Sequence, residues 1–401
     1  MGVEWGVRAG GHHPLRDRTA VAGIGATEFS RDSGRTELRL ACEAVTAALA
    51  DAGLEPAAVD GMVTFTMDGT DEIEIARATG IGDLAFFSRV PHGGGAACAT
   101  VGQAALAIAA GAAEVVVCYR ALNGRSWSRF GAGVQDLPAA PTADRVHFGW
   151  YAPFGLVTPA HWVAMAARRA MHEFGWTSED FGRVAVADRR HAATNPAARF
   201  HGRPLTLAEH QASRLIAEPL RLLDCCQETD GAVALVITSA ERARTLRRRP
   251  ALVRAVTQGA GADQEVMTSY YREDITGLPE LGLAARRLWG AAGVGPADVQ
   301  AAVLYDHFTP LVLTQLAELG FCGRGEGADF VRDGGIELGG RLPVNTNGGQ
   351  LGEAYVHGMN GIAEAVRLVR GTAVNQVQDV QHVVVTAGTG VPTSALLLAR
   401  D

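Results

Sequence analysis

The chain contains 401 residues, of which 47% are hydrophobic and 20% are charged, and its formal net charge is −7 at pH 7. This composition supplies a sizeable apolar core and excludes a globally disordered chain. All 36 basic residues are arginines, which excludes a Schiff-base mechanism and the lysine of a phosphate-binding loop. The acidic net charge and the lack of a long basic run predict no nucleic-acid partner.

The N-terminus and the cysteines indicate where the protein works. Residues 1–18 are polar and rich in glycine, and we expect a disordered lead-in that lacks the apolar stretch of a signal peptide. No run of about 20 apolar residues predicts a membrane span. The six cysteines have no CxxC spacing, which indicates reduced thiols. Together these features predict a cytoplasmic protein with no membrane partner.

The first predicted elements are a short apolar strand from residue 19 and an amphipathic helix over 36–53. Gly23 and Gly25 lie on the strand and could begin a dinucleotide-binding fingerprint. However, Glu28 occupies the place of its third glycine, and the residues that follow do not open a helix. We therefore reject a dinucleotide site.

The helix-to-strand passage occurs a second time further along the chain. AGLEPAAVDGMV at 52–63 matches AGVGPADVQAAV at 292–303 without a gap, 240 positions later. Each copy ends a predicted helix at a glycine and then enters a predicted strand.

A second matched pair follows in the same order. Gly93, Gly94 and Gly95 lead into an alanine-rich helix and a strand, and Gly348 and Gly349 are expected to lead into the equivalent helix, which ends near residue 371. This repetition predicts an α/β protein with apolar strands buried between helices. The two halves would cover residues 19–250 and 251–401.

The first half carries an insertion at about 120–220. Its beginning is rich in aromatic side chains, which we expect to form either a satellite packing cluster or a cap that walls a large apolar pocket. These aromatic residues are Trp127, Phe130, Phe148, Trp150, Tyr151, Phe154 and Trp162.

Four segments resemble the thiolase superfamily, and the resemblance covers nearly the whole chain. They are VAGIGATEF at 21–29, DCCQETDGAVALV at 224–236, YDHFTP at 305–310 and NTNGGQLGEAYVHGMNG at 345–361. The four look like the sterol-carrier-protein-x, lipid-transfer branch, and the last two look like its actinobacterial steroid side-chain-cleaving aldolases. The resemblance implies a thiolase fold, in which two duplicated βαβ halves form a five-layer αβαβα body with an inserted loop or cap region.

The same resemblance implies a reaction and partners. Such aldolases perform retro-aldol cleavage of a β-hydroxy steroid acyl-CoA of the 17-hydroxy-3-oxopregnene-20-carboxyl-CoA type. The products would be a 17-keto steroid and propionyl-CoA, formed in sterol or bile-acid side-chain degradation. The resemblance also implies a homodimer that forms a heterotetramer with the OB-fold domain of a hydratase subunit. We expect no cofactor other than the coenzyme A carried by the substrate.

The chain departs from working thiolases at the residues that transfer acyl groups. The glycine turn 93–95 occupies the place of the nucleophilic cysteine, and Cys98 lies about one turn further along. Tyr355 stands at the histidine of the GHP motif, with His357 two residues later. These replacements argue against thiolase activity.

Two further family positions differ. Tyr305 stands at the Asn or His that opens the NEAF or HDCF motif, and His307 stands where that motif carries Ala or Cys. Thr386 occupies the place of the second cysteine of biosynthetic thiolases. Tyrosine thus replaces two acyl-transfer residues.

Retro-aldol cleavage requires proton transfer from the hydroxyl group, stabilisation of an enolate and protonation of carbon. A phenol can donate and accept protons, so we predict that Tyr305 and Tyr355 form the acid–base pair. Asp306, His307 and His357 are expected either to orient them or to form structural hydrogen bonds. The backbone amides at 93–95 and 348–349 are expected to hold the enolate oxygen. No HExxH-like metal spacing is present.

Two alternatives remain open on sequence grounds. One is a Cys98-dependent thiolase or acyltransferase, and the other is a non-catalytic lipid-transfer or scaffold protein. Labelling of Cys98 would favour the first, and steroid-CoA binding without turnover would favour the second.

Overall fold

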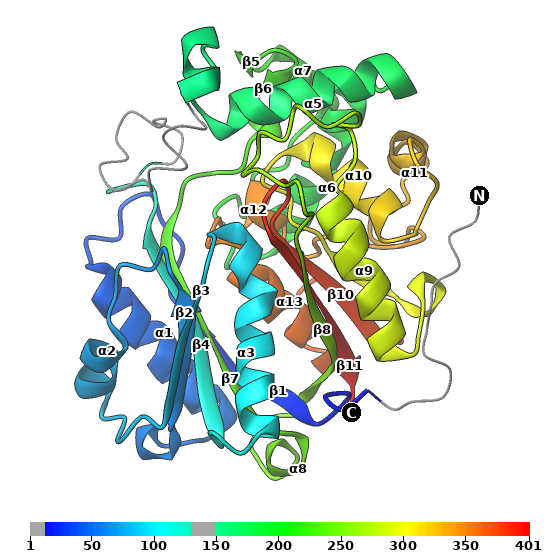
Figure 1. Cartoon of the computed structure of the whole chain (residues 1–401). Helices are drawn as coiled ribbons and strands as arrows, with labels where there is room; N and C mark the ends of the chain where they lie inside the picture. Colours follow the sequence, from blue (N-terminus) through cyan, green and yellow to red (C-terminus); the bar gives the residue numbers. More distant parts are fainter. Residues whose placement is uncertain (1–12, 128, 130–148) are drawn as a thin grey trace.

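The computed structural model describes residues 13–127, 129 and 149–401 (Figure 1). The named strands form a nine-stranded sheet and a two-stranded ribbon, β5 (Leu215–Ala217) and β6 (Leu220–Arg221). The order in the large sheet is β3 (Phe86–Val90), β2 (Gly61–Phe65), β4 (Val115–Asn123), β7 (Asp230–Ser239), β1 (Thr19–Ala26), β8 (Ala251–Gly259), β11 (Thr393–Arg400), β10 (His382–Ala387) and β9 (Ala301–Val303).

The sheet consists of two halves that meet at one pair of strands. The first five strands in the order come from residues 19–239, and the other four come from residues 251–400. Between the halves, β1 and β8 pair at only two positions, Ala20 with Leu252 and Val21 with Ala251. The two halves of the chain therefore contribute separate parts of one continuous sheet.

Helices form three layers around these strands (Figure 1). α1 (Glu37–Ala52) and α2 (Glu72–Thr79) cover the outer face of the first half, and their apolar side chains form one buried cluster with β1, β2, β4 and β7. α9 (Pro279–Ala292) and α10 (Thr309–Glu318) cover the outer face of the second half.

The middle layer contains α3 (Ala97–Ala109) and α13 (Met359–Arg370), and most residues of both helices are buried. Their apolar side chains form a single cluster with strands of both halves. The alternation of helix, strand, helix, strand and helix layers confirms the expected αβαβα arrangement, because both faces of each half-sheet must be covered by apolar helix surfaces.

The duplication is visible in local geometry as well as in topology. α1 ends at Gly53 (φ 76°) and α9 ends at Gly293 (φ 70°), both in the left-handed region that glycine adopts without strain. Each is followed by one turn of 3-10 helix that begins with proline, at Pro56 and Pro296. Strands β2 and β9 then begin at residues 61 and 301, which preserves the 240-residue offset.

The segment between β4 and β7 contains the helices of the inserted region. They are α5 (Pro159–Phe174), α6 (Ser178–Thr194) and α7 (Leu207–Ala212). Apolar residues of α5 and α6 join the same buried cluster as α9 and α10. The insertion of the first half therefore packs over the second half.

Two expectations about the backbone are wrong. Within the lead-in, residues 13–18 form a turn that is fixed by Arg16, whose Nε donates to the Ala291 carbonyl at 2.8 Å, and by an Asp17–Arg254 ion pair at 2.9 Å. Residues 1–12 lie outside the described residues.

The expected helix after the second glycine turn also differs. Gly348 and Gly349 lead only into the single turn α12 (Gly349–Gly352), and the long helix α13 begins after Gly358 instead.

The glycines of β1 have a packing role rather than a nucleotide-binding role. A Cβ atom at Gly23 would lie 2.2 Å from the Ala48 carbonyl oxygen of α1, and one at Gly25 would lie 2.3 Å from the Ala44 carbonyl oxygen. Only glycine allows α1 to approach β1 so closely.

We predict that Gly23→Ala lowers the free energy of unfolding by about 1–3 kcal/mol, because the new methyl group overpacks the α1–β1 contact. Urea titration followed by circular dichroism measures the change. Gly290→Ala is the matched control, since its Cβ would meet no atom within 4 Å in α9. That control should raise stability by about 0.5–1 kcal/mol, and equal effects of the two variants would contradict the packing argument.

Candidate active site

The two tyrosines nominated from the sequence meet in the structure. Tyr305 follows β9, Tyr355 lies between α12 and α13, and their hydroxyl oxygens are 3.3 Å apart. The backbone amide of Tyr305 donates to Thr386 Oγ1 at 2.9 Å, and the backbone amide of Tyr355 donates to Thr229 Oγ1 at 3.2 Å. Residues from two separate segments thus fix the backbones of the two tyrosines.

The phenol of Tyr305 occupies the place of a missing side chain. A Cβ atom at Gly94 would lie 1.9 Å from Tyr305 Oη. Any side chain at position 94, including a nucleophilic cysteine, would therefore overlap the phenol. The expectation that the turn 93–95 stands at the nucleophile position stays a prediction.

Cys98 lies behind the glycine turn rather than in the site. Its side chain is completely buried, and its Sγ donates to the Val385 carbonyl at 3.7 Å. Burial raises the pKa of the Cys98 thiol far above its ordinary value. Such a thiol has neither the access nor the ionised form of a nucleophile.

Both phenols are neutral at physiological pH. Burial, followed by the charge of Tyr355, raises the pKa of Tyr305 well above 10. Burial also raises the pKa of Tyr355, against the opposing effects of the Tyr305 hydroxyl and Arg120. Neither tyrosine is therefore a resting phenolate.

The glycine turn brings backbone donors close to Tyr305. Gly93 donates its amide to Met67 Sδ at 3.2 Å, and Gly94 and Gly95 begin a single 3-10 turn. The N–H groups of the first residues of a helical turn have no acceptor within that turn. The amides of Gly94 and Gly95 are thus suited by position to bind an oxygen atom.

The amides of Gly348 and Gly349 are not placed to serve the tyrosines. Gly348 donates to the Asn345 carbonyl at 2.8 Å, and Gly349 donates to Asn347 Oδ1 at 3.2 Å. The expectation that they hold an enolate is wrong in this geometry, because local turn formation already uses both donors.

Asp306 anchors this segment. Its carboxylate accepts the backbone N–H of Gln350 at 2.8 Å and that of Leu351 at 3.0 Å, which satisfies the N-terminus of α12. Asp306 therefore orients the segment that leads to Tyr355 and does not face the hydroxyl pair.

A second buried carboxyl group lies beside Asp306. Asp188, on α6, faces Asp306 and the Asn345 side-chain amide, although neither of its carboxyl oxygens makes a well-formed hydrogen bond within the described residues. Burial and the charge of Asp306 raise the pKa of Asp188 well above its ordinary value. We therefore assign the proton of the pair to Asp188 and the charge to Asp306, which accepts the α12 amides.

His307 is a neutral neighbour of Tyr305. Its ring centroid is 4.9 Å from that of Tyr305, and Thr389 Oγ1 lies 3.3 Å from its Nδ1. Burial lowers the pKa of His307 to about 3. It supports the Tyr305 ring and does not act as a cation.

His357 connects Tyr355 to two residues that the sequence did not nominate. Its ring is 5.2 Å from that of Tyr355, and its Nδ1 accepts from Arg120 Nε at 3.1 Å. Arg120 in turn pairs with Asp68 at 2.8 Å. The signal that could have found Arg120 is a cation inside the apolar strand VVVCYRALN, because an arginine that is fully buried in a strand requires a partner.

Glu353 secures the segment just before Tyr355. Its carboxylate accepts from Asn195 Nδ2 at 3.2 Å, from Asn360 Nδ2 at 2.9 Å and from the side chain of Asn347. Burial raises the pKa of Glu353 to about 7. Three parts of the chain are thus held together at the base of the tyrosine segment.

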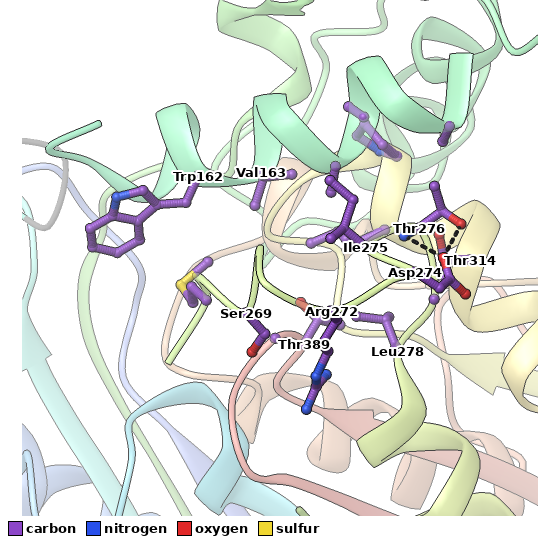
Figure 2. A pocket seen from close by; sticks show the side chains of 18 of the residues that line it. Trp162, Val163, Ser269, Arg272, Asp274, Ile275, Thr276, Leu278, Thr314 and Thr389 are labelled. Atoms are coloured by element: carbon purple, nitrogen blue, oxygen red, sulfur yellow. Dashed lines mark hydrogen bonds between the residues drawn. The ribbon is translucent and has the colours of Figure 1, made fainter. Parts of the chain in front are cut away.

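A small pocket of about 70 Å³ lies beside this centre, between α5, α10 and residues 267–280 (Figure 2). Thr389, which contacts His307, lines the pocket. Its volume is far below the several hundred Å³ needed to enclose a drug-sized ligand. The pocket cannot surround a steroid nucleus.

The described aromatic residues of the insertion line the small pocket, pack against a neighbouring ring or are exposed. Trp162 lines the small pocket, and Tyr151 packs edge-on against Tyr270 with ring centroids 5.3 Å apart. Three others, Trp127, Trp150 and Phe154, are exposed, and Phe130 and Phe148 lie outside the described residues.

Two kinds of feature are absent from the described part of the chain. Within residues 13–127, 129 and 149–401, no group of three or more His, Cys, Asp or Glu side chains is arranged to hold a metal ion. Over the same residues, no helix combines the length and apolarity required to cross a bilayer.

Comparison with known proteins identifies the family of the chain. Residues 260–399 match the family described as Thiolase C-terminal domain-like. The chain is 66% identical over 387 residues to the steroid side-chain-cleaving aldolase of Thermomonospora curvata, covering 96% of this chain and 99% of that protein. It is 63% identical over 384 residues to the 17-hydroxy-3-oxo-4-pregnene-20-carboxyl-CoA lyase of Mycobacterium tuberculosis, covering 96% and 100%.

Solved structures give the same result. The Ltp2-ChsH2(DUF35) aldolase superposes with a TM-score of 0.92 at 66% identity, and the match covers 96% of this chain and 99% of that chain. A monomeric SCP2-thiolase-like protein type 1 from Mycobacterium smegmatis gives 0.71 at 21% identity, with coverage of 96% and 77%, which shows the fold alone.

The fold and the matching family model define a protein of the thiolase superfamily, in which the Tyr305 hydroxyl leaves no room for a side chain at position 94. The chain belongs to the steroid side-chain-cleaving aldolases of that superfamily.

We predict that Asp188→Asn removes a pH-dependent loss of stability. Asp188 is protonated in the folded state and ionised in the unfolded state above about pH 4, so the wild-type protein loses about 1.4 kcal/mol per pH unit from this group until the folded pKa is reached. Asparagine cannot ionise in either state. The Tm of the variant minus the Tm of the wild type, measured by calorimetry, should therefore increase as the pH is raised from 5 to 8.

Asp180→Asn on the same helix is the matched control. Asp180 pairs with Arg332 at 2.6 Å, which holds its pKa below the ordinary value, so this variant should lose stability at both pH values. If Asp188→Asn lost stability equally at pH 5 and pH 8, the proton assignment would be wrong.

Proposed function

We propose that this chain catalyses retro-aldol cleavage of a tertiary β-hydroxy steroid acyl-CoA of the 17-hydroxy-3-oxopregnene-20-carboxyl-CoA type. The products are a 17-keto steroid and propionyl-CoA, in sterol or bile-acid side-chain degradation. One observation carries the proposal: the Tyr305 hydroxyl occupies the room of a side chain at Gly94, in the turn expected to replace the nucleophile, and lies 3.3 Å from the Tyr355 hydroxyl. The names of the two relatives that are 66% and 63% identical support the substrate class.

The tyrosine pair moves one proton from oxygen to carbon. The substrate hydroxyl gives its proton to one phenol, that phenol passes its own proton to the other, and the second phenol protonates the enolate carbon. Meanwhile the carbon–carbon bond breaks, its electron pair forms the thioester enolate, and the alcohol becomes a ketone. Because the pair is neutral before and after the cycle, raised pKa values of both phenols are compatible with turnover. Hydroxyl hydrogens rotate, so the 3.3 Å contact allows the proton relay to run through the two tyrosines in either order.

The enolate oxygen needs donors aimed at the place where charge develops. In the proposal, the amides of Gly94 and Gly95 provide them, because they open a helical turn beside Tyr305. No Schiff base takes part, since the chain has no lysine. The proposed reaction has no step that requires a metal ion, so chelation with EDTA should leave turnover intact.

The proposed working form is a homodimer with a partner domain in the cytoplasm. β3 pairs with β2 on one side only and is an end strand of the described sheet, with the Phe87 side chain 69% exposed. An exposed edge of this kind is suited to pairing with a second copy. The expected OB-fold domain of a hydratase subunit is supported by the similar solved structure, whose name places ChsH2(DUF35) beside the aldolase Ltp2.

The alternatives are less well supported. A Cys98-dependent thiolase conflicts with the buried, neutral thiol. A lipid carrier or scaffold would not need two phenols within 3.3 Å of each other.

We predict that Tyr305→Phe and Tyr355→Phe each reduce kcat by about 10²–10⁴-fold while the protein remains folded, because each removes one hydroxyl from the proton path. The assay follows ketone and propionyl-CoA release by the chain with its partner domain. Tyr271→Phe, at an exposed tyrosine, is the control and should keep wild-type turnover. Near-wild-type cleavage by both phenylalanine variants would refute the mechanism, and substrate binding by the wild type without turnover would favour the carrier.

We predict that Cys98→Ala keeps at least about half of wild-type turnover, because the thiol contributes packing and not chemistry. In the native protein, iodoacetamide should leave Cys98 unlabelled, as judged by peptide mass spectrometry, whereas the partly exposed Cys42 provides an internal control. An acyl adduct on Cys98 would support a thiolase instead.

A further inference from the structure

A buried ion pair lies next to the tyrosine pair. The side chains of Asp68 and Arg120 are 0% and 1% exposed, and Arg120 Nη1 lies 2.8 Å from Asp68 Oδ2. A buried pair of this kind is often less stabilising than apolar side chains of similar volume. Its presence beside Tyr355 therefore calls for a reason other than stability.

Asp68 holds the guanidinium in one orientation. Its carboxylate also accepts the backbone amide of Ala121 at 3.0 Å and that of Thr70 at 3.0 Å. Arg120 Nη1 donates in addition to the Ala121 carbonyl at 2.7 Å. With Nη1 engaged in this way, the Nε–H of Arg120 is directed at His357 Nδ1, 3.1 Å away.

This contact fixes the tautomer of His357. An arginine is always protonated and can only donate, so Nδ1 must be the acceptor and the imidazole proton must lie on Nε2. Burial and the Arg120 charge hold the pKa of His357 well below its ordinary value, so the ring is neutral. A Cβ at Gly93 would lie 3.1 Å from His357 Nε2, which places this N–H against the glycine turn that borders Tyr305.

The same guanidinium places a positive charge near Tyr355. The Tyr355 and His357 rings are in edge-to-face contact at 5.2 Å, and Arg120 contacts the imidazole at its Nδ1 edge. Arg120 also lies over the Phe65 ring at 5.6 Å, and Phe65 stacks on His357 at 5.9 Å. Apolar surroundings strengthen the effect of the charge on any proton transfer through Tyr355.

We propose that Arg120, held by Asp68, is a positioning residue for the carbon–carbon cleavage: it fixes His357 as the Nε2–H donor beside the glycine turn and stabilises negative charge that develops on Tyr355. This role rests on the proposed function, because it assumes that Tyr355 carries a proton in the reaction. The Nε2–H group adds a side-chain donor to the backbone donors of the turn.

The test uses the double variant Asp68→Asn/Arg120→Gln, which removes both charges and leaves no buried charge unpaired. With the partner domain present, kcat should fall by about 30-fold or more while KM stays within about 3-fold, since the lost charge acts on the transition state. The single variant Arg120→Lys keeps a positive charge but lacks the forked donors of arginine. Its kcat should therefore lie between that of the wild type and that of the double variant.

The control is Asp51→Asn/Arg370→Gln. It removes another Arg–Asp pair, in which Arg370 is 5% exposed and lies 2.8 Å from Asp51, where the end of α13 meets α1. This variant should lower Tm without changing kcat by more than about 2-fold. An equal loss of kcat in both double variants would show that Arg120 is only structural.

A phenol made more acidic by ring fluorination gives a second kinetic readout. Fluorotyrosine at position 355 should restore kcat at least about 5-fold in the Asp68→Asn/Arg120→Gln variant and change it less than about 3-fold in the wild type. The same effect in both backgrounds would overturn the charge part of the proposal.

The tautomer part is tested without turnover. Solid-state ¹⁵N spectra of histidine-labelled protein, with His357→Gln for assignment, should show the Nε2–H tautomer in the wild type and its loss in the double variant. An unchanged tautomer would overturn this part. Failure of the wild type to cleave substrate with the partner domain would instead refute the proposed function and leave the tautomer result standing.

Discussion

The site depends on one steric condition: the hydroxyl of Tyr305 occupies the room in which a side chain at position 94 would lie. Glycine is therefore required at position 94. Residues on the other side of Tyr305 fix its backbone and pack against its ring. The Tyr305 backbone is bound by Thr386 and by Gln315, whose Nε2 donates to the Tyr305 carbonyl at 2.9 Å. Gly358, with φ 86°, places its Cα so close to the ring that a Cβ would lie 3.2 Å from it.

The duplicated fold explains why these groups meet. Tyr305 and Phe65 occupy equivalent positions after β9 and at the end of β2, 240 residues apart. Tyr305 from the second half contacts the turn before α3 of the first half, and Phe65 from the first half stacks on His357 before α13 of the second half. Each strand end thus packs against the helix start of the other half. The proposed acid–base pair lies at the first of these contacts, and the buried Arg120–Asp68 ion pair lies beside the second.

The repeat of 52–63 at 292–303 predicts the duplicated fold from the sequence alone, whereas the two tyrosines are nominated through the family resemblance of the YDHF and EAYVHG segments. The sequence cannot place Arg120, since the partner His357 is 237 residues away and the contact exists only after the halves assemble. The assignment to Gly348 and Gly349 failed because Gly358 carries the same signal further along the chain, and spacing does not reveal which glycine starts the long helix.

The 3.3 Å contact between two neutral hydroxyl groups has a consequence for the direction of the proposed reaction. Because the pair begins and ends the cycle in the same protonation state, no separate proton exchange is needed before the reverse reaction. The same relay run backwards returns a proton to the alkoxide, so the site would also join a ketone to a thioester enolate. Net cleavage is then decided by mass action, through the removal of ketone and acyl-CoA, and not by the enzyme.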